Sequence, residues 1–138
     1  MNNPETSFFD IQDENYPGLI YLASPYTHAY PEVMELRYRL AMRAVKEFTM
    51  KGCTVLSPIV HYHPIATGSH MPSDFDFWGT HNLRMLKSCS AMKVLQIPGH
   101  LGSKGIKAEV IAARGLQIPI EYVTLNVNVY LKFEMAWA

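Results

Sequence analysis

The sequence predicts a single-domain α/β fold with helices on both faces of a doubly wound, mainly parallel sheet. Length and composition favour one buried core, because the chain has 138 residues, of which 49% are hydrophobic and 17% charged. Short apolar runs alternate with longer segments whose apolar residues recur at helical spacing. Proline and glycine turns separate the two kinds of segment.

The first half of the chain predicts a strand, a helix and a second strand. Residues 19–23 form a continuous apolar run that ends at the turn Ser24–Thr27, which is typical of a strand buried on both faces. Residues 31–51 place apolar side chains on one helical face, and Pro31 suits a first helical position. Residues 53–56 are the next expected strand.

The second half continues the alternation after a long irregular stretch. Residues 58–76 contain three prolines and a glycine, so we expect a loop there, and a loop of that length is usually functional. Residues 77–88 and 106–114 have helical spacing. Residues 92–97 and 118–123 are the third and fourth expected strands.

The expected organisation is one domain with two short extensions. Residues 1–18 are a polar N-terminal lead-in, and residues 19–123 make up the α/β domain. Residues 124–138 begin with alternating apolar residues, which indicates either one more strand or an arm that contacts another subunit.

Composition narrows the classes of function. Twelve Lys and Arg balance twelve Asp and Glu, so the chain lacks the net positive charge typical of nucleic-acid binding. No apolar run approaches the length of a membrane span, and the first residues do not resemble a secretory signal. Cys53 and Cys89 form neither a disulfide framework nor a CxxC site. We therefore expect two buried thiols and a cytoplasmic protein that binds a small molecule.

Candidate ligand-binding residues follow the expected strands, because ligands of such folds bind at the carboxyl ends of the strands. Ser24-Pro25-Tyr26 follows the first strand and Ser103-Lys104-Gly105 opens the last helix. A serine and free backbone N–H groups at a helix N-terminus can bind an anion, and Lys104 would add charge. The simpler interpretation, compatible with this one, is that Ser103 only caps the helix.

Glu109 is the candidate catalytic residue. It lies early in the last predicted helix, between Ala108 and Val110. A carboxylate in an apolar stretch is unfavourable unless it is paired or used, so Glu109 is a candidate nucleophile or general base. The pattern leaves open a glutamate that simply faces solvent.

The expected loop 58–76 offers two further chemistries. His61-x-His63 could contribute to a zinc or iron site, with Asp74 and Asp76 nearby, but no complete ligand set is visible. We therefore expect no metal, and histidines that line a pocket. The aromatic residues Phe75, Phe77 and Trp78 could stack on a planar ring while a carboxylate binds its edge, or they could simply pack the loop onto the core.

Four segments together give a resemblance to a known family. They are Ile20–Tyr26, Gly52–Pro58, Asp76-x-Trp78 through Asn82-Leu83, and Ser103-x-Gly105-x-x-x-Glu109. In this order and spacing the chain resembles the nucleoside 2-deoxyribosyltransferase-like superfamily and is most similar to its DUF1937 family. The resemblance covers residues 19–123 and implies a flavodoxin-like (Rossmann-like) fold, which agrees with the fold expected from the sequence pattern.

The resemblance also implies an activity. Enzymes of the superfamily cleave the N-glycosidic bond of 2′-deoxynucleosides or their 5′-monophosphates through a glutamate that attacks C1′. By resemblance, Glu109 would be this nucleophile and Tyr21 the tyrosine that hydrogen-bonds it. Ser103 matches a serine of the monophosphate hydrolases, where the transferases have aspartate. This implies a phosphorylated ligand held by Ser103 and the turn at Ser24.

One position departs from the family pattern. Asn82 stands where the superfamily has an aspartate that handles the proton of the base. An amide cannot act as a general acid at neutral pH. Asp76 would then take this role, or the base would leave unaided.

The resemblance implies no cofactor, and it implies a homodimer or a larger homo-oligomer. Two other functions stay open. One is a non-catalytic nucleotide-binding module, which Asn82 favours. The other is a metal-dependent hydrolase that uses His61, His63 and the neighbouring aspartates.

Overall fold

A computed structural model describes residues 18–72 and 74–125 of the 138-residue chain. The expected strand or arm at 124–138 lies outside the described residues from residue 126 on, and of the expected lead-in at 1–18 only Gly18 is described. Among the described residues, no helix combines the length and the hydropathy that a membrane span requires.

The centre of the fold is a parallel β-sheet. Its strands are β1 (Leu19–Ala23), β2 (Thr54–Leu56), β3 (Ala91–Leu95) and β4 (Ile120–Val123). Within the described residues they pair in the order β2-β1-β3-β4, and every pairing is parallel. The predicted α/β fold, of the flavodoxin-like kind, is therefore confirmed.

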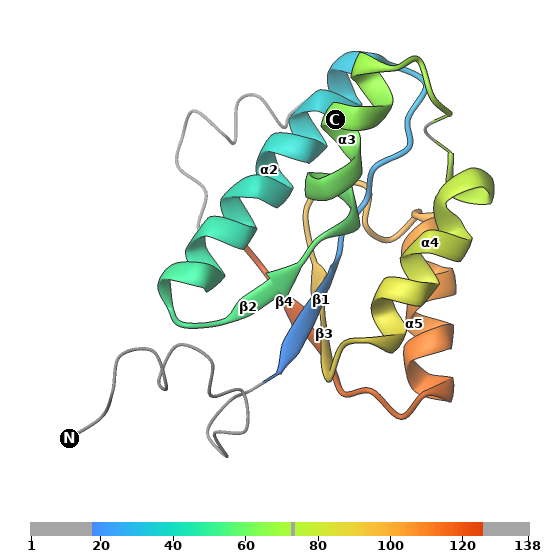
Figure 1. Cartoon of the computed structure of the whole chain (residues 1–138). Helices are drawn as coiled ribbons and strands as arrows, with labels where there is room; N and C mark the ends of the chain where they lie inside the picture. Colours follow the sequence, from blue (N-terminus) through green and yellow to red (C-terminus); the bar gives the residue numbers. More distant parts are fainter. Residues whose placement is uncertain (1–17, 73, 126–138) are drawn as a thin grey trace, which may run out of the picture.

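Helices lie on both sides of this sheet (Figure 1). They are α2 (Pro31–Met50), α3 (Pro58–Gly68), α4 (Phe75–Lys87) and α5 (Lys104–Gly115). Figure 1 shows α2 and α3 on one side of the sheet, and α4 and α5 side by side on the other.

Two apolar clusters fix this layered arrangement. On the α2 side, Leu22 and Leu95 of the sheet pack with Leu36 and Leu40 of α2. On the other side, sheet residues pack with α4 and α5; the buried members are Tyr21, Ala23, Leu86, Cys89, Met92, Val94, Ile106, Val110 and Ala113. Each central strand therefore buries side chains on both faces, as expected for a parallel sheet covered by helices.

The region 58–76 corrects one prediction. Residues 58–68 form helix α3 rather than a loop. Pro58 occupies the first turn, where a missing N–H costs nothing, and the Ser57 side chain caps the helix by accepting a hydrogen bond from Val60 N at 3.2 Å. Pro64 lies inside the helix, where proline is normally unfavourable, and its presence is the reason that the prediction of a loop was wrong here.

The sheet order creates a topological switch point between β1 and β3. From β1 the chain crosses to β2 on one side and later to β3 on the other. The segments that leave the carboxyl ends of these two neighbouring strands therefore diverge and leave a crevice, which is where such folds bind ligands.

Candidate active site

A cleft of about 500 Å³ opens at this switch point. It is lined by residues that follow β1 and β3 and by residues of all four described helices: Leu22, Ser24, Tyr26, Thr27, His28, Arg37, Pro58, Ile59, Tyr62, His63, Ala66, Asp74, Phe75, Asp76, Trp78, Asn82, Gly99, Gly102, Ser103, Lys104, Gly105 and Glu109. Its volume lies in the range of small-molecule sites. Most of the predicted site residues therefore come together in one place.

Glu109 is the buried carboxyl group of this cleft. Its side chain is 5% exposed and accepts a hydrogen bond from the hydroxyl of Tyr21, which is fully buried in β1. Burial raises the pKa of Glu109 to about 7, and the hydrogen bond from Tyr21 partly opposes this rise. Tyr21 does not itself line the cleft, so it holds the carboxyl group from behind.

The spacing of α5 explains why Glu109 points inward. The helix begins at the cap residue Ser103, whose hydroxyl oxygen accepts a hydrogen bond from Ile106 N at 3.1 Å. Ile106, Glu109, Val110 and Ala113 then recur at intervals of three and four and are all buried. Glu109 therefore lies on the apolar face of the helix, and the alternative of a solvent-facing glutamate is wrong.

Gly105 leaves room for this carboxyl group. A Cβ at this position would lie 3.2 Å from the ring of Phe75 and 3.7 Å from Glu109 Oε1. Phe75 also packs against Gly79 of α4, where a Cβ would lie 3.0 Å from the ring. Phe75 is thus an aromatic residue of the predicted cluster that lines the cleft and packs against Gly105 and Gly79.

Arg37 is a functional candidate that sequence reasoning missed. It is 6% exposed, and its Nη1 donates hydrogen bonds to the carbonyl oxygens of Tyr26 at 3.2 Å and Thr27 at 3.0 Å. Its guanidinium group also packs on Gly99, which has a φ of +99° and where a Cβ would lie 2.3 Å from Nη2. Arg37 therefore connects the segments that follow β1 and β3.

The electrostatics of Arg37 are unusual. Among residues 18–72 and 74–125, no carboxylate forms an ion pair with it, and its buried Nε has no hydrogen-bond partner. Burial lowers its pKa, although an arginine stays protonated at neutral pH. The signal for its position was the spacing of buried residues in α2, where Arg37 stands among Val33, Leu40 and Ala44.

Two more polar atoms in the cleft lack partners. In the described part of the chain, the buried hydroxyl oxygen of Ser24 and the buried Oδ1 of Asn82 form no hydrogen bond. Buried polar groups in proteins are almost always satisfied, so a polar ligand or a water molecule can complete the hydrogen bonding of these two atoms.

Aromatic side chains form one wall of the cleft. Trp78 is buried, donates its indole N–H to Pro72 O at 2.6 Å and lies with its ring centre 4.3 Å from that of Tyr62. Tyr62 belongs to α3 and was missed because that helix was expected to be a loop. Phe77 is exposed and does not line the cleft.

The remaining predicted residues have more modest positions. Asp76 and Lys104 are both exposed at the rim and form an ion pair at 3.1 Å. The Asp76 carboxylate beside Lys104 would repel a bound anion, which weakens the expected role of Lys104 in binding one. Pro25 is fully buried behind the cleft and does not line it.

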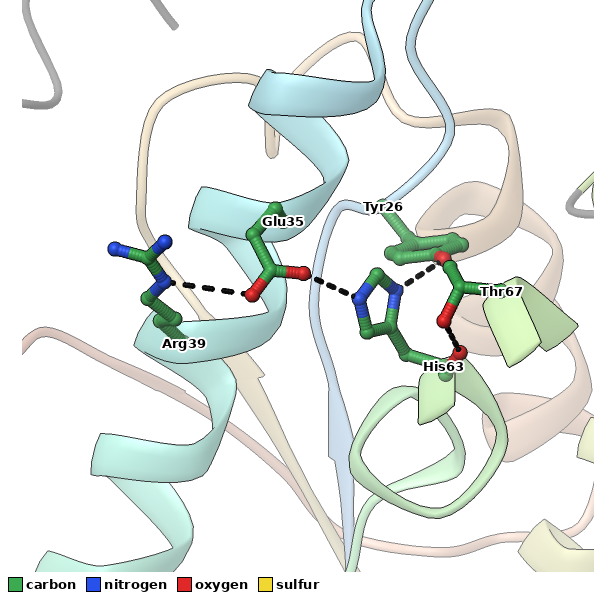
Figure 2. A network of polar contacts seen from close by, with 5 residues as sticks. All are labelled: Tyr26, Glu35, Arg39, His63 and Thr67. Carbon is green, nitrogen blue, oxygen red and sulfur yellow. Dashed lines mark hydrogen bonds and ion pairs between the residues drawn. The ribbon is translucent and has the colours of Figure 1, made fainter. Parts of the chain in front are cut away.

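The two histidines of the proposed metal motif do not converge. His61 and His63 stand two positions apart on helix α3, so they point to different sides. His61 is exposed, whereas His63 is buried between Tyr26 and Glu35 (Figure 2). Among the described residues, no group of three or more His, Cys, Asp or Glu side chains could hold a metal ion.

Fold and cleft together define a small α/β protein with a buried carboxyl group at the switch point of a parallel sheet. The chain belongs to the family described as "Domain of unknown function (DUF1937)", whose model matches residues 18–124. The predicted similarity to this family is therefore confirmed. No curated protein shows significant similarity to the chain.

Proposed function

We propose that this protein cleaves the N-glycosidic bond of a small nucleoside or nucleoside 5′-monophosphate, with Glu109 as the nucleophile. The observation that carries the proposal is the Glu109 carboxyl group, buried in a ligand-sized cleft and held by the hydroxyl of Tyr21. A buried carboxyl group with a raised pKa in a cleft is typical of a functional site.

The chemistry would proceed in two displacements. The Glu109 carboxylate attacks C1′ as the bond between C1′ and the base nitrogen breaks, and the electron pair leaves with the base, which takes a proton from water. The transition state resembles an oxocarbenium ion, which the nearby carboxylate stabilises before it forms a glycosyl ester. Water then releases the sugar, or a second base accepts it. Tyr21 contributes by keeping the carboxyl group oriented.

An anionic ligand fits the polar groups of the cleft. Arg37 carries an unpaired positive charge within the described chain, and the hydroxyl of Ser24 has no partner there. Ser103 accepts from the backbone at the N-terminus of α5, so its own O–H stays available as a donor. A helix N-terminus also favours negative charge. These groups support a phosphorylated ligand.

The base would lie against the aromatic wall. Trp78 and Tyr62 supply flat surfaces, and the free Oδ1 of Asn82 can accept a hydrogen bond from an N–H group of the base. Asp76 is exposed and paired with Lys104 at the rim, so its position gives little support to a role as proton donor to the base. We therefore propose that the base leaves without an acid from Asp76.

A second candidate is a nucleotide-binding module without catalysis. Asn82 favours it, because an amide cannot deliver the proton that an acidic residue would supply at that position. The same unpartnered polar atoms and aromatic wall would serve binding alone.

Release of free base from a panel of deoxynucleosides and deoxynucleoside 5′-monophosphates tests the proposal. We expect release by the native protein and none by Glu109→Gln, which keeps the size of the side chain. Glu121→Gln is the matched control, because Glu121 is exposed on β4, away from the cleft. Calorimetric titration of Glu109→Gln with the same ligands should show that binding persists.

Two results would contradict the proposal. Base release by Glu109→Gln at the native rate would remove Glu109 from the reaction. Tight binding of a nucleotide by the native protein, without release of base from any member of the panel, would instead favour the binding module.

A further inference from the structure

Three side chains form a continuous hydrogen-bonded chain beside the cleft (Figure 2). The hydroxyl of Tyr26 lies 2.5 Å from Nδ1 of His63, and Nε2 of His63 lies 2.7 Å from Oε2 of Glu35. These residues come from three separate segments, namely the β1–α2 connection, α3 and α2. The chain of contacts thus joins residues far apart in the sequence.

The imidazole of His63 is held firmly in this arrangement. It is 5% exposed and stacks on the ring of Tyr38, with ring centres 4.2 Å apart. Thr67 donates a hydrogen bond to the carbonyl oxygen of His63 at 2.8 Å, one turn along the helix. Stacking and this backbone contact keep the ring in place, so that Nδ1 faces Tyr26 and Nε2 faces Glu35.

The protons of the chain can be assigned from the chemistry of its ends. The carboxylate of Glu35 can only accept, so Nε2 of His63 carries a hydrogen. In the neutral imidazole Nδ1 is then an acceptor, and the Tyr26 hydroxyl donates to it. The oxygen of Tyr26 consequently offers lone pairs to the cleft. Toward a ligand or water molecule, Tyr26 is therefore an acceptor.

The chain runs from the cleft to the protein surface. Tyr26 and His63 line the cleft, whereas the Glu35 side chain is 43% exposed and lies outside it. Glu109 belongs to α5, and Figure 1 shows α5 on the opposite side of the sheet from α2 and α3. Tyr26 is hydrogen-bonded to His63 of α3 and so lies at the α3 end of the cleft, whereas Glu109 lines the cleft from α5.

We infer that Tyr26, His63 and Glu35 form a proton-transfer chain that activates the water molecule attacking the glycosyl ester on Glu109. The inference rests on the proposed function and adds the general base that the second displacement requires. That water must approach C1′ from the side away from Glu109, and the α2–α3 side of the cleft offers a fixed acceptor there.

The step balances as follows. The water oxygen bonds to C1′, the bond between C1′ and the Glu109 oxygen breaks, and its electron pair returns to the carboxylate. The water proton passes to the Tyr26 oxygen while the hydroxyl proton of Tyr26 passes to Nδ1 of His63. His63 is then an imidazolium beside the Glu35 carboxylate, and it loses the extra proton to solvent before the next turnover.

The environment of Tyr26 suits this role. Burial, aided by the negative charge of Glu35, raises the pKa of Tyr26 to about 12. The phenol therefore stays protonated at neutral pH and passes a proton on instead of losing its own. The Tyr26 hydroxyl therefore relays a proton from the water molecule to His63.

Tyr26→Phe, which removes a single oxygen atom, tests the inference. We expect steady-state base release to fall by about 100-fold or more, the usual contribution of a general base, while the first turnover keeps its rate. The first turnover then appears as a burst of base equal to the enzyme concentration, and mass spectrometry should detect a sugar adduct on the protein. Glu35→Gln, at a half-exposed position, should cause a smaller fall in the steady-state rate alone.

Tyr122→Phe is the matched control, because it removes a phenol oxygen from an exposed side chain on β4 that does not line the cleft. Circular dichroism and urea unfolding confirm that each variant is folded. Native steady-state turnover by Tyr26→Phe would overturn the inference and leave the role of Glu109 intact. An equal fall of burst and steady-state rates would also overturn it, since that pattern indicates a general loss of site geometry. Absence of base release from the native protein would overturn the proposed function and this inference together.

Discussion

Replacing Glu109 with glutamine is expected to stabilise the protein at alkaline pH and to leave its stability nearly unchanged at acid pH. Burial raises the pKa of this carboxyl group from 4.5 to about 7 in the folded chain. Between these two values the folded chain holds a proton that the unfolded chain has lost. The free energy of unfolding therefore falls as pH rises through this window and stays low above it.

The magnitude follows from the size of the pKa change. One pKa unit corresponds to about 1.4 kcal/mol, so the rise from 4.5 to about 7 lowers the free energy of unfolding of the native protein by about 3 kcal/mol above neutral pH. Glutamine remains neutral and has nearly the same shape, and its amide oxygen can still accept from Tyr21. Glu109→Gln should therefore match the native protein near about pH 4 and exceed it by about 3 kcal/mol near about pH 8.5.

Urea unfolding of both proteins at a series of pH values measures this difference. Other carboxyl groups titrate equally in the two proteins and cancel in the comparison. Glu121→Gln is the control, because the Glu121 side chain is 67% exposed, although its partner Lys93 is only 15% exposed. A pair with one exposed member should contribute about 1 kcal/mol or less. A difference between Glu109→Gln and native protein that does not change with pH would refute the idea that burial raises this pKa.

Three further changes test other contacts. Tyr21→Phe removes the hydrogen bond that lowers the pKa of Glu109, so the rising limb of a pH–rate profile for base release should move above its native midpoint of about 7. Gly99→Ala places a methyl group 2.3 Å from Arg37 Nη2 at a φ of +99°, and urea unfolding should show a loss of about 1–3 kcal/mol. Ser103→Ala removes the cap of α5 and should lower stability by about 1 kcal/mol in thermal unfolding.

The changes at Gly99 and Ser103 have matched controls. Gly115→Ala adds a methyl group with no atom within 4 Å, at a position without a positive φ, and should not destabilise the protein. Ser103→Thr keeps a capping oxygen and should retain most of the stability. An unchanged profile in Tyr21→Phe, or equal stabilities of the two alanine variants at glycine positions, would contradict the contacts described above.

The fold could be predicted because its signals are local. Apolar runs such as residues 19–23 and helical spacing such as residues 31–51 lie at or within a residue or two of the observed elements. Helix α3 could not be predicted, because the local preference of Pro64 is against a helix interior. Because this helix was expected to be a loop, the positions of Tyr62 and His63 could not be predicted either. Sequence spacing indicates which way a side chain points in a helix, but not in a loop.

The part of the candidate site that could be predicted also depended on local signals. Glu109 stood out as a carboxylate in an apolar stretch, and counting three and four residues from Ile106 and Ala113 would already have placed it on the buried face. The role of Arg37 could not be predicted, because α2 contains several charged residues and the sequence does not distinguish Arg37 from the others. Its partners are backbone carbonyl oxygens of another segment, which no sequence pattern reveals.

The contacts of the Arg37 guanidinium group have a consequence for how much the protein changes when a ligand binds in the cleft. This group holds the Tyr26–Thr27 backbone by two hydrogen bonds and packs on Gly99, so contacts within the protein already order these two chain segments. The entropy cost of ordering these two segments is therefore met during folding and not during ligand binding. Recognition at the floor of the cleft should therefore follow lock-and-key behaviour, with a conformation that differs little between the free and occupied forms.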